Sequence, residues 1–298
     1  SARKPFKAYI EWLHHQDKSK ALAFWQNALG HVSNGCLLRA DFGDSKEPEY
    51  AVENISVPAI LTQKITRFAK DNAVTMASLI QAAWAYLLHR YSGSNSVLFG
   101  TTIAGRPSDL QDADNMIGNF INTIPVSVTL DDKKKVGDWL KQIHTQHAER
   151  EQYGFVPLAS LKQITMLAKG DAMFNSIMVF ENYPVASLAE EQPEGFSLSV
   201  ENAQANEGTN FDLTLVVHPG EQIKLQMMYR ADLYRHSRVC QLLSTVNLIL
   251  DNMVDNANQM LGDIDLMVGN QEQESDELEQ LLNGVSEEDL EMLMAEIS

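Results

Sequence analysis

The chain has 298 residues, of which 44% are hydrophobic and 21% are charged, and its formal net charge is −17. This length and apolar content predict one large globular domain or two of ordinary size. With 23 Lys and Arg against 40 Asp and Glu, binding to nucleic acid or to an anionic membrane surface is not expected. No run approaches the ~20 apolar residues that span a bilayer, and the polar start does not resemble a signal peptide, so we expect a cytoplasmic protein.

Most of the negative charge lies at the C-terminus. Residues 271–298 hold ten acidic residues and no Lys or Arg, which gives −10, whereas residues 1–270 hold 30 acidic and 23 basic residues, which gives −7. Ser286 with Asp289 resembles a capping box, and the apolar residues after it recur at helical spacing: Leu290, Leu293, Met294 and Ile297. We therefore expect residues 270–298 to form an acidic amphipathic tail.

The first part of the chain predicts helices and one strand. Aromatic and aliphatic residues at helical spacing predict two helices within residues 5–29, closed by Gly30, and a loop or irregular strand follows over residues 31–50. Residues 51–57 have the composition of a strand. Pro58 suits the start of the next helix, whose apolar face comprises Leu61, Ile65, Phe68 and Ala69.

The rest of the chain alternates between strands and helices. Thr75 is expected to cap a helix that Gly93 ends, with a buried apolar stripe between them. A strand beyond Pro125 and a helix over residues 136–150 come later. Further strands are expected at 97–103, 173–180, 196–201, 211–218 and 222–229, and a long helix at 236–254. This order predicts an α/β open sandwich, with helices flanking a mixed sheet.

Few residues suggest catalysis by their type and spacing. The pair in His14-His15-Gln16-Asp17 would suit a base with an orienting carboxylate, but neighbours on a helix point about 100° apart, which favours a solvated helix end. His89, His144 and His147 are interpreted as surface or packing residues, although the last two, three apart, leave metal binding as an alternative. The sequence alone therefore names no catalytic residue.

The two cysteines do not predict a disulfide framework or a metal site. Cys36 and Cys240 are isolated in the sequence, so we interpret both as small buried hydrophobic residues. Glycine-rich phosphate loops, the HExxH pair and the Gly-x-Ser-x-Gly elbow are all absent from the sequence. No metal site is expected.

Five segments, in order, carry a resemblance to one family. They are Tyr9-Ile10-Glu11-Trp12-Leu13 with Ala23-Phe24-Trp25, Gly105-Arg106-Pro107, Ile117-Gly118-Asn119-Phe120-Ile121-Asn122-Thr123-Ile124-Pro125-Val126, Tyr153-Gly154-Phe155-Val156-Pro157-Leu158, and the stretch from Phe174 to Pro184 that ends Phe-Glu-Asn-Tyr-Pro. Together they resemble the condensation domain of nonribosomal peptide synthetases. The resemblance runs from about residue 5 to residue 268, and Asn122-Thr123 favours condensation over the related epimerisation domains.

The resemblance implies a chloramphenicol-acetyltransferase-like fold. Family members have two such lobes, and the N-terminal lobe carries a catalytic His-His-x-x-x-Asp-Gly motif that this sequence lacks. The chain therefore resembles the C-terminal lobe over residues 31–269, with residues 1–30 as the crossover helices from the N-terminal lobe. One further departure is Ser127, which stands where family members often carry Arg.

The resemblance also implies a reaction and partners. The family joins a donor thioester and an acceptor amine, both bound to carrier proteins through 4′-phosphopantetheine, so no cofactor is expected on this chain itself. The alternative is a non-catalytic module for carrier docking or scaffolding. Expected partners are the two carrier proteins, the N-terminal lobe and, through the acidic tail, a downstream synthetase subunit. A frayed terminus, or a helix folded back on the lobe, is the alternative for the tail.

The site residues follow from the same resemblance. Asn122 and Thr123 are candidates to hydrogen-bond pantetheine or a thioester oxyanion, or else to brace the turn before Pro125. Gly118 and Asn210 are further candidates for the substrate tunnel, with Asn210 close to a possible hinge or an ordinary turn. Arg106 would pair with a carrier phosphate or brace its own loop.

Overall fold

A computed structural model describes residues 4–181, 209–264 and 266. The described residues up to Ile264 belong to one compact unit. The strand expected at 196–201 and the whole tail over 270–298, including Leu290, Leu293, Met294 and Ile297, lie outside the described residues.

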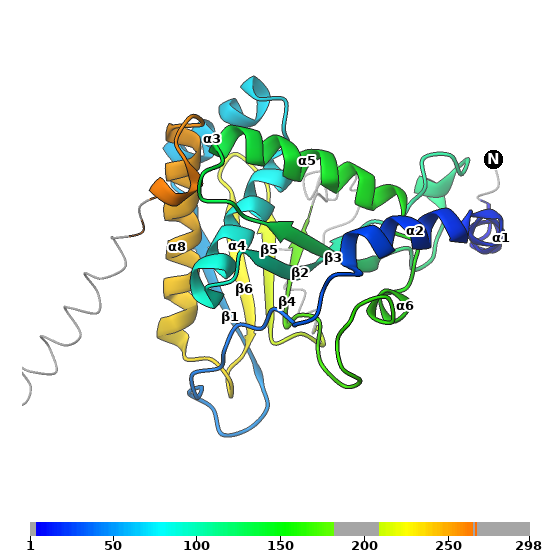
Figure 1. Ribbon diagram of the computed structural model, residues 1–298, viewed down its shortest axis with the longest axis horizontal. Helices are drawn as coiled ribbons and strands as arrows, with labels where there is room; N and C mark the ends of the chain where they lie inside the picture. The colour runs from blue at the N-terminus through cyan, green and yellow to red at the C-terminus, as the bar shows by residue number, and fades with distance from the viewer. Residues whose placement is uncertain (1–3, 182–208, 265, 267–298) are drawn as a thin grey trace, which may run out of the picture. The chain divides into compact units, whose positions relative to one another are not determined.

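Six strands of the described residues form one mixed sheet, in the order β1-β6-β5-β4-β2-β3 (Figure 1). Strand β4 pairs in parallel with both β2 and β5, and the other three pairings are antiparallel. The strands are β1 (Tyr50–Ser56), β2 (Ser96–Ile103), β3 (Asn122–Thr129), β4 (Ser176–Phe180), β5 (Leu213–His218) and β6 (Lys224–Arg230). The predicted mixed sheet is confirmed, and the two strands after residue 210 pair with each other.

The start of β3 differs from the prediction. The strand begins at Asn122, before Pro125, whereas the sequence placed it beyond that proline. Proline has no backbone N–H to donate, so it fits a sheet only where that bond is not needed. β3 is the last strand in the described sheet and pairs there with β2 alone, which is the kind of position where a sheet tolerates proline.

Three helices pack together over the sheet as the sequence predicted: α3 (Ala59–Asp71), α4 (Met76–Ser92) and α8 (His236–Asp255). Helix α4 contacts β2, and α8 contacts β1 and β6. The Thr75 side chain caps α4 by accepting from the backbone N–H of Ser78, and Gly93 ends it with a left-handed φ of 66°. Every residue of α4 from Ser78 to His89 is buried, more than the single predicted stripe, because α5 and α8 both contact it.

The remaining helices lie at the chain's beginning and middle. Within the described residues these α-helices are α1 (Lys7–His15), α2 (Lys18–Leu29), α5 (Val136–Gln152) and the short α6 (Leu158–Lys162), which the sequence did not predict. His14 and His15 are exposed in the last turn of α1, as expected for a solvated helix end. Within the described part of the chain, no helix is long and apolar enough to cross a membrane.

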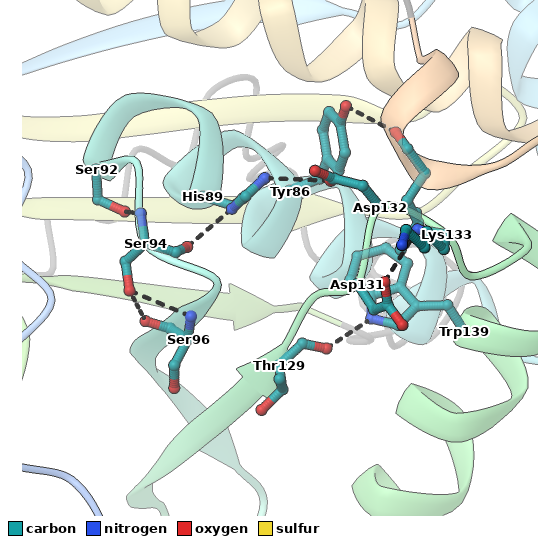
Figure 2. Close-up of polar contacts among 11 residues, drawn as sticks. Tyr86, His89, Ser92, Ser94, Ser96, Thr129, Asp131, Asp132, Lys133 and Trp139 are labelled. Carbon is teal, nitrogen blue, oxygen red and sulfur yellow. Dashed lines mark hydrogen bonds and ion pairs between the residues drawn. The ribbon is translucent and has the colours of Figure 1, made fainter.

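Polar contacts tie the end of α4 to the segments around it (Figure 2). His89 is buried, and its Nδ1 lies 2.8 Å from the carbonyl oxygen of Ser94, while its Nε2 lies 3.7 Å from Asp132. The Tyr86 hydroxyl donates to the carbonyl of Leu261, and Trp139 Nε1 donates to that of Thr129. His89 is thus a packing residue, as interpreted from the sequence.

One asparagine holds the irregular segment between α2 and β1. Asn175 Nδ2 donates to the carbonyl of Leu38, to Asp212 and to the Tyr234 hydroxyl, while its Oδ1 accepts from the Leu38 N–H. Close by, Cys36 forms an isolated bridge with Phe174. Cys36 is buried, as predicted, but Cys240 is only half-buried.

Candidate functional site

A cavity of about 700 Å³ opens beside the carboxyl end of β2. Helix α1 contributes Tyr9 and Trp12, and Gln16 follows directly after the helix. The other walls are the turn around Arg106, the residues Asn119–Asn122, the end of α5 and the loop after it. Four of the five segments that carry the family resemblance therefore line one cavity, although the first and last are far apart in the sequence.

Aromatic rings fix α1 against one wall. The Tyr9 ring lies 4.6 Å from the Phe120 ring and 5.9 Å from Trp12, and Phe6 meets Phe120 edge-on at 5.0 Å. A Cβ at Gly118 would lie 2.1 Å from the Phe6 ring, so only glycine permits this packing. The aromatic cluster explains why the segment of residues 117–126 carries glycine and phenylalanine two residues apart.

Arg106 braces the loop that follows it. Its Nη1 donates to the carbonyls of Ala113 and Met116, and its guanidinium lies 4.3 Å from the Phe120 ring centroid. Gly105 has φ +62°, and a Cβ there would lie 1.8 Å from the Phe120 carbonyl oxygen. The Gly-Arg pair thus shapes the cavity wall through the backbone and the guanidinium together.

Asn122 joins β3 to the loop after α5. Its Nδ2 donates to the carbonyls of Gly154, at 2.6 Å, and Val156, at 3.1 Å. Thr123 is half-buried and pairs across the sheet with Thr102. Among the tunnel candidates, Asn122 lines the cavity, whereas the described lining residues do not include Gly118, Thr123 or Asn210; Arg106, the candidate for a carrier phosphate or for bracing its loop, also lines it.

A family model, described as the condensation domain, matches residues 1–275. The chain belongs to the condensation domain family. Tyrocidine synthase 3 of Brevibacillus parabrevis is 30% identical over 278 residues, which are 92% of this chain and 4% of that protein. Bacitracin synthase 3 of Bacillus licheniformis is 30% identical over 268 residues, which are 89% of this chain and 4% of that protein. The chain thus spans a small part of these relatives.

Solved structures share the fold of this condensation domain. The X-domain from teicoplanin biosynthesis matches with a TM-score of 0.68 and 21% identity, over 87% of this chain and 60% of that one. A four-domain nonribosomal peptide synthetase bound to AMP and glycine matches with the same TM-score and 18% identity, over 84% of this chain and 20% of that one. The predicted chloramphenicol-acetyltransferase-like fold is confirmed.

Two carboxylates that sequence reasoning missed also line the cavity of the condensation domain. Asp109 accepts from Trp12 Nε1 at 3.1 Å, and Glu151 lies at the end of α5, where burial raises the pKa of its carboxyl. Asp109 belongs to a loop and Glu151 to a helix end, so no local spacing links them to the motif residues. The only sequence signal was their closeness to Gly105-Arg106-Pro107 and to Tyr153.

The histidines of α5 face α4. His144 Nδ1 lies 3.1 Å from the Ser78 hydroxyl, and Gln81 Nε2 lies 3.4 Å from Nδ1 of His147. Burial, reinforced by the charge of Arg150, lowers the pKa of His147 to about 4, so this imidazole is neutral near pH 7. Their placement is that of packing residues between two helices.

A second cavity of about 300 Å³ lies between α2, β3 and α5. Ser127, the position where the family often carries Arg, lines it together with Arg150. The Arg150 side chain is buried, and its Nε and Nη2 have no hydrogen-bond partner among the described residues. Burial lowers the pKa of Arg150 to about 10.

Proposed function

We propose that this chain is the C-terminal lobe of a condensation domain, with residues 1–30 as crossover helices and residues 31–269 as the lobe. Paired with an N-terminal lobe that carries the His-His-x-x-x-Asp-Gly motif, it would join a carrier-bound donor thioester to an acceptor amine. The main support is that four motif segments line one cavity, through Tyr9, Arg106, Asn122 and Phe155. This chain aligns with 60% of the length of the teicoplanin X-domain, and that share fits one lobe with its crossover helices.

In this proposal the cavity residues bind the substrate arm rather than perform the chemistry. Asn122 uses its Nδ2 on two carbonyls, so its Oδ1 is the atom left to accept from an amide N–H of pantetheine. Thr123, Gly118 and Asn210 remain candidates for the tunnel wall that the two lobes would complete. Arg106 shapes the loop through its carbonyl contacts, and the carboxylates of Asp109 and Glu151 favour a protonated amine over a phosphate in the cavity.

The test compares the isolated chain with the chain fused to an N-terminal lobe from a relative. Carrier-bound donor and acceptor are supplied, and the carrier-bound product is measured by mass spectrometry. We expect product from the fusion and none from the isolated chain, because the isolated chain has no motif base. Amide formation by the isolated chain would show that the chemistry has been placed in the wrong lobe.

A binding measurement tests the cavity separately. Pantetheine amide is titrated into the chain by calorimetry, and Asn122→Ala should weaken its binding at least several-fold. Asn54→Ala is the matched control, since Asn54 lies on β1 and bonds to Gln226 rather than lining the cavity. Equal binding by both variants would remove Asn122 from the proposed substrate site.

The alternative function, a non-catalytic module for carrier docking or scaffolding, is suggested by the absence of the His-His-x-x-x-Asp-Gly motif from this sequence. A non-catalytic module would bind holo-carrier proteins, yet the fusion would make no product even with a competent N-terminal lobe. The same two measurements therefore separate the two functions, because only the catalytic hypothesis predicts product from the fusion.

We also propose that the acidic tail docks to a downstream synthetase subunit. Its leucines would fill an apolar groove while its carboxylates meet a basic rim, an arrangement that speeds association and weakens with salt. Deleting residues 271–298 should leave the melting temperature nearly unchanged and abolish salt-sensitive binding to that subunit. A large drop in melting temperature would instead indicate that Leu290, Leu293, Met294 and Ile297 pack on the lobe itself.

A further inference from the structure

Three side chains with metal-binding atoms meet where α8 begins beside the edge strand β1. His236 is the first residue of α8, Cys240 follows one turn later on the same face, and Glu53 reaches them from β1. Glu53 Oε2 lies 3.5 Å from His236 Nδ1, and the Cys240 sulfur lies 4.0 Å from the same nitrogen. One donor atom from each residue lies within 4.8 Å of the other two.

These separations are close to those around a tetrahedral ion. Zinc binds nitrogen and oxygen at about 2.0–2.2 Å and sulfur at about 2.3 Å, so its donor atoms lie about 3.3–3.6 Å apart. The Glu53 to His236 distance of 3.5 Å already fits that range. The Cys240 sulfur lies 4.0 Å from Nδ1 and would have to approach it by less than 1 Å. A small side-chain rotation is enough for such a shift.

The surroundings hold the histidine in place and make the cluster negative. The backbone N–H of His236 donates to Asp44 at 2.8 Å, and that of Arg235 donates to Asp41 at 3.1 Å, so the loop before β1 caps α8. The Tyr229 hydroxyl lies 3.5 Å from His236 Nδ1, and Asp44 and Glu53 add carboxylates next to this histidine.

We propose that Glu53, His236 and Cys240 form a site for a borderline-soft divalent cation of the zinc class, with water as the fourth ligand. A carboxylate and an imidazole alone would make an ordinary surface ion pair. The sulfur changes the chemistry, because a thiolate selects zinc-class ions over magnesium and calcium. The ion would clip the edge strand β1 to the start of α8.

The site is separate from the cavity described above. β1 and β3 are the two ends of the described sheet, and the cavity lies at β2 and β3. Sequence spacing predicted no metal site, since only His236 and Cys240 are near each other in the chain and a strand far upstream supplies the third ligand. Loading the ion should therefore stabilise the fold without altering pantetheine binding.

Cobalt titration of the reduced chain tests the proposal, because Co²⁺ takes the zinc geometry and a thiolate ligand adds a near-ultraviolet charge-transfer band. We expect the band to saturate at one equivalent and to vanish when Zn²⁺ is added. Cys240→Ser should abolish the band, and His236→Gln and Glu53→Gln should each weaken Co²⁺ binding at least about tenfold. Cys36→Ala is the matched control and should keep the full band, since Cys36 is buried beside Phe174.

A second readout separates metal binding from misfolding of a variant. Zn²⁺ should raise the urea midpoint of the parent chain and of Cys36→Ala but not that of Cys240→Ser, because a ligand that binds only the folded state stabilises it. Far-ultraviolet circular dichroism checks that the apo variants are folded. The proposal is overturned if the parent chain shows no charge-transfer band at saturating Co²⁺, or if the band persists in Cys240→Ser.

Discussion

Arg150 is a buried cation whose removal should stabilise the fold. Its side chain is 4% exposed, and neither Nε nor Nη2 has a hydrogen-bond partner among the described residues. Burial lowers the pKa of this guanidinium by about two and a half units from its usual value, to about 10. At about 1.4 kcal/mol per pKa unit, the charge disfavours the folded state by about 3 kcal/mol at any pH below 10.

Arg150→Met removes the charge and keeps most of the aliphatic stem. Because a buried charge with two unbonded nitrogens is replaced by an apolar side chain, the free energy of unfolding should rise by about 2 kcal/mol. The 3 kcal/mol already includes the attraction to Glu149 and Glu151, and part of it is not recovered because methionine does not fill the buried space of the guanidinium nitrogens. For a chain of this size the melting temperature should rise by about 5 °C.

Urea unfolding at pH 7, followed by circular dichroism, measures the change. Arg67→Met is the matched control, because the Arg67 side chain is 85% exposed on α3 and its removal should change stability by under about 0.5 kcal/mol. A loss of more than about 1 kcal/mol in Arg150→Met would refute the reasoning, since it would mean that the guanidinium has a stabilising partner.

Three further predictions concern stability. Burial lowers the pKa of His147 from 6.5 to about 4, so between these pH values the unfolded chain binds a proton at His147 and the folded chain does not. The free energy of unfolding should therefore fall by up to about 3 kcal/mol between pH 7 and pH 4. Urea unfolding at both pH values should show a smaller fall for His147→Gln. Gly105→Ala should lower the free energy of unfolding by more than about 2 kcal/mol, because the new Cβ would meet the carbonyl of Phe120. Gly93→Ala has a similar φ but open space around it, so it should lower that free energy by about 1 kcal/mol. Equal losses of stability in thermal melts would contradict this. Asn175→Ala should cost about 2 kcal/mol and raise amide exchange in residues 36–40, since its amide bonds that loop.

Local sequence patterns determined most of the elements. The apolar spacing of α8, the Thr75 cap and the Gly93 stop of α4 were readable because each depends on residues within a few positions of one another. Likewise, the signature residues 117–126 indicated the family, since their resemblance requires no knowledge of packing. Short features were missed: α6 has five residues, too few to show a helical period.

Tertiary structure decided which of these residues meet. No local pattern groups Glu151 with Trp12, or Glu53 with Cys240, because each pair is separated by several elements and is joined only by the strand order. The sequence also left open whether Asn122 bonds to a ligand or to the chain, and the fold directs its Nδ2 to two carbonyls. The spacing of apolar residues indicates which face of a helix or strand is buried. Which distant elements lie close together depends on the order of the strands in the sheet.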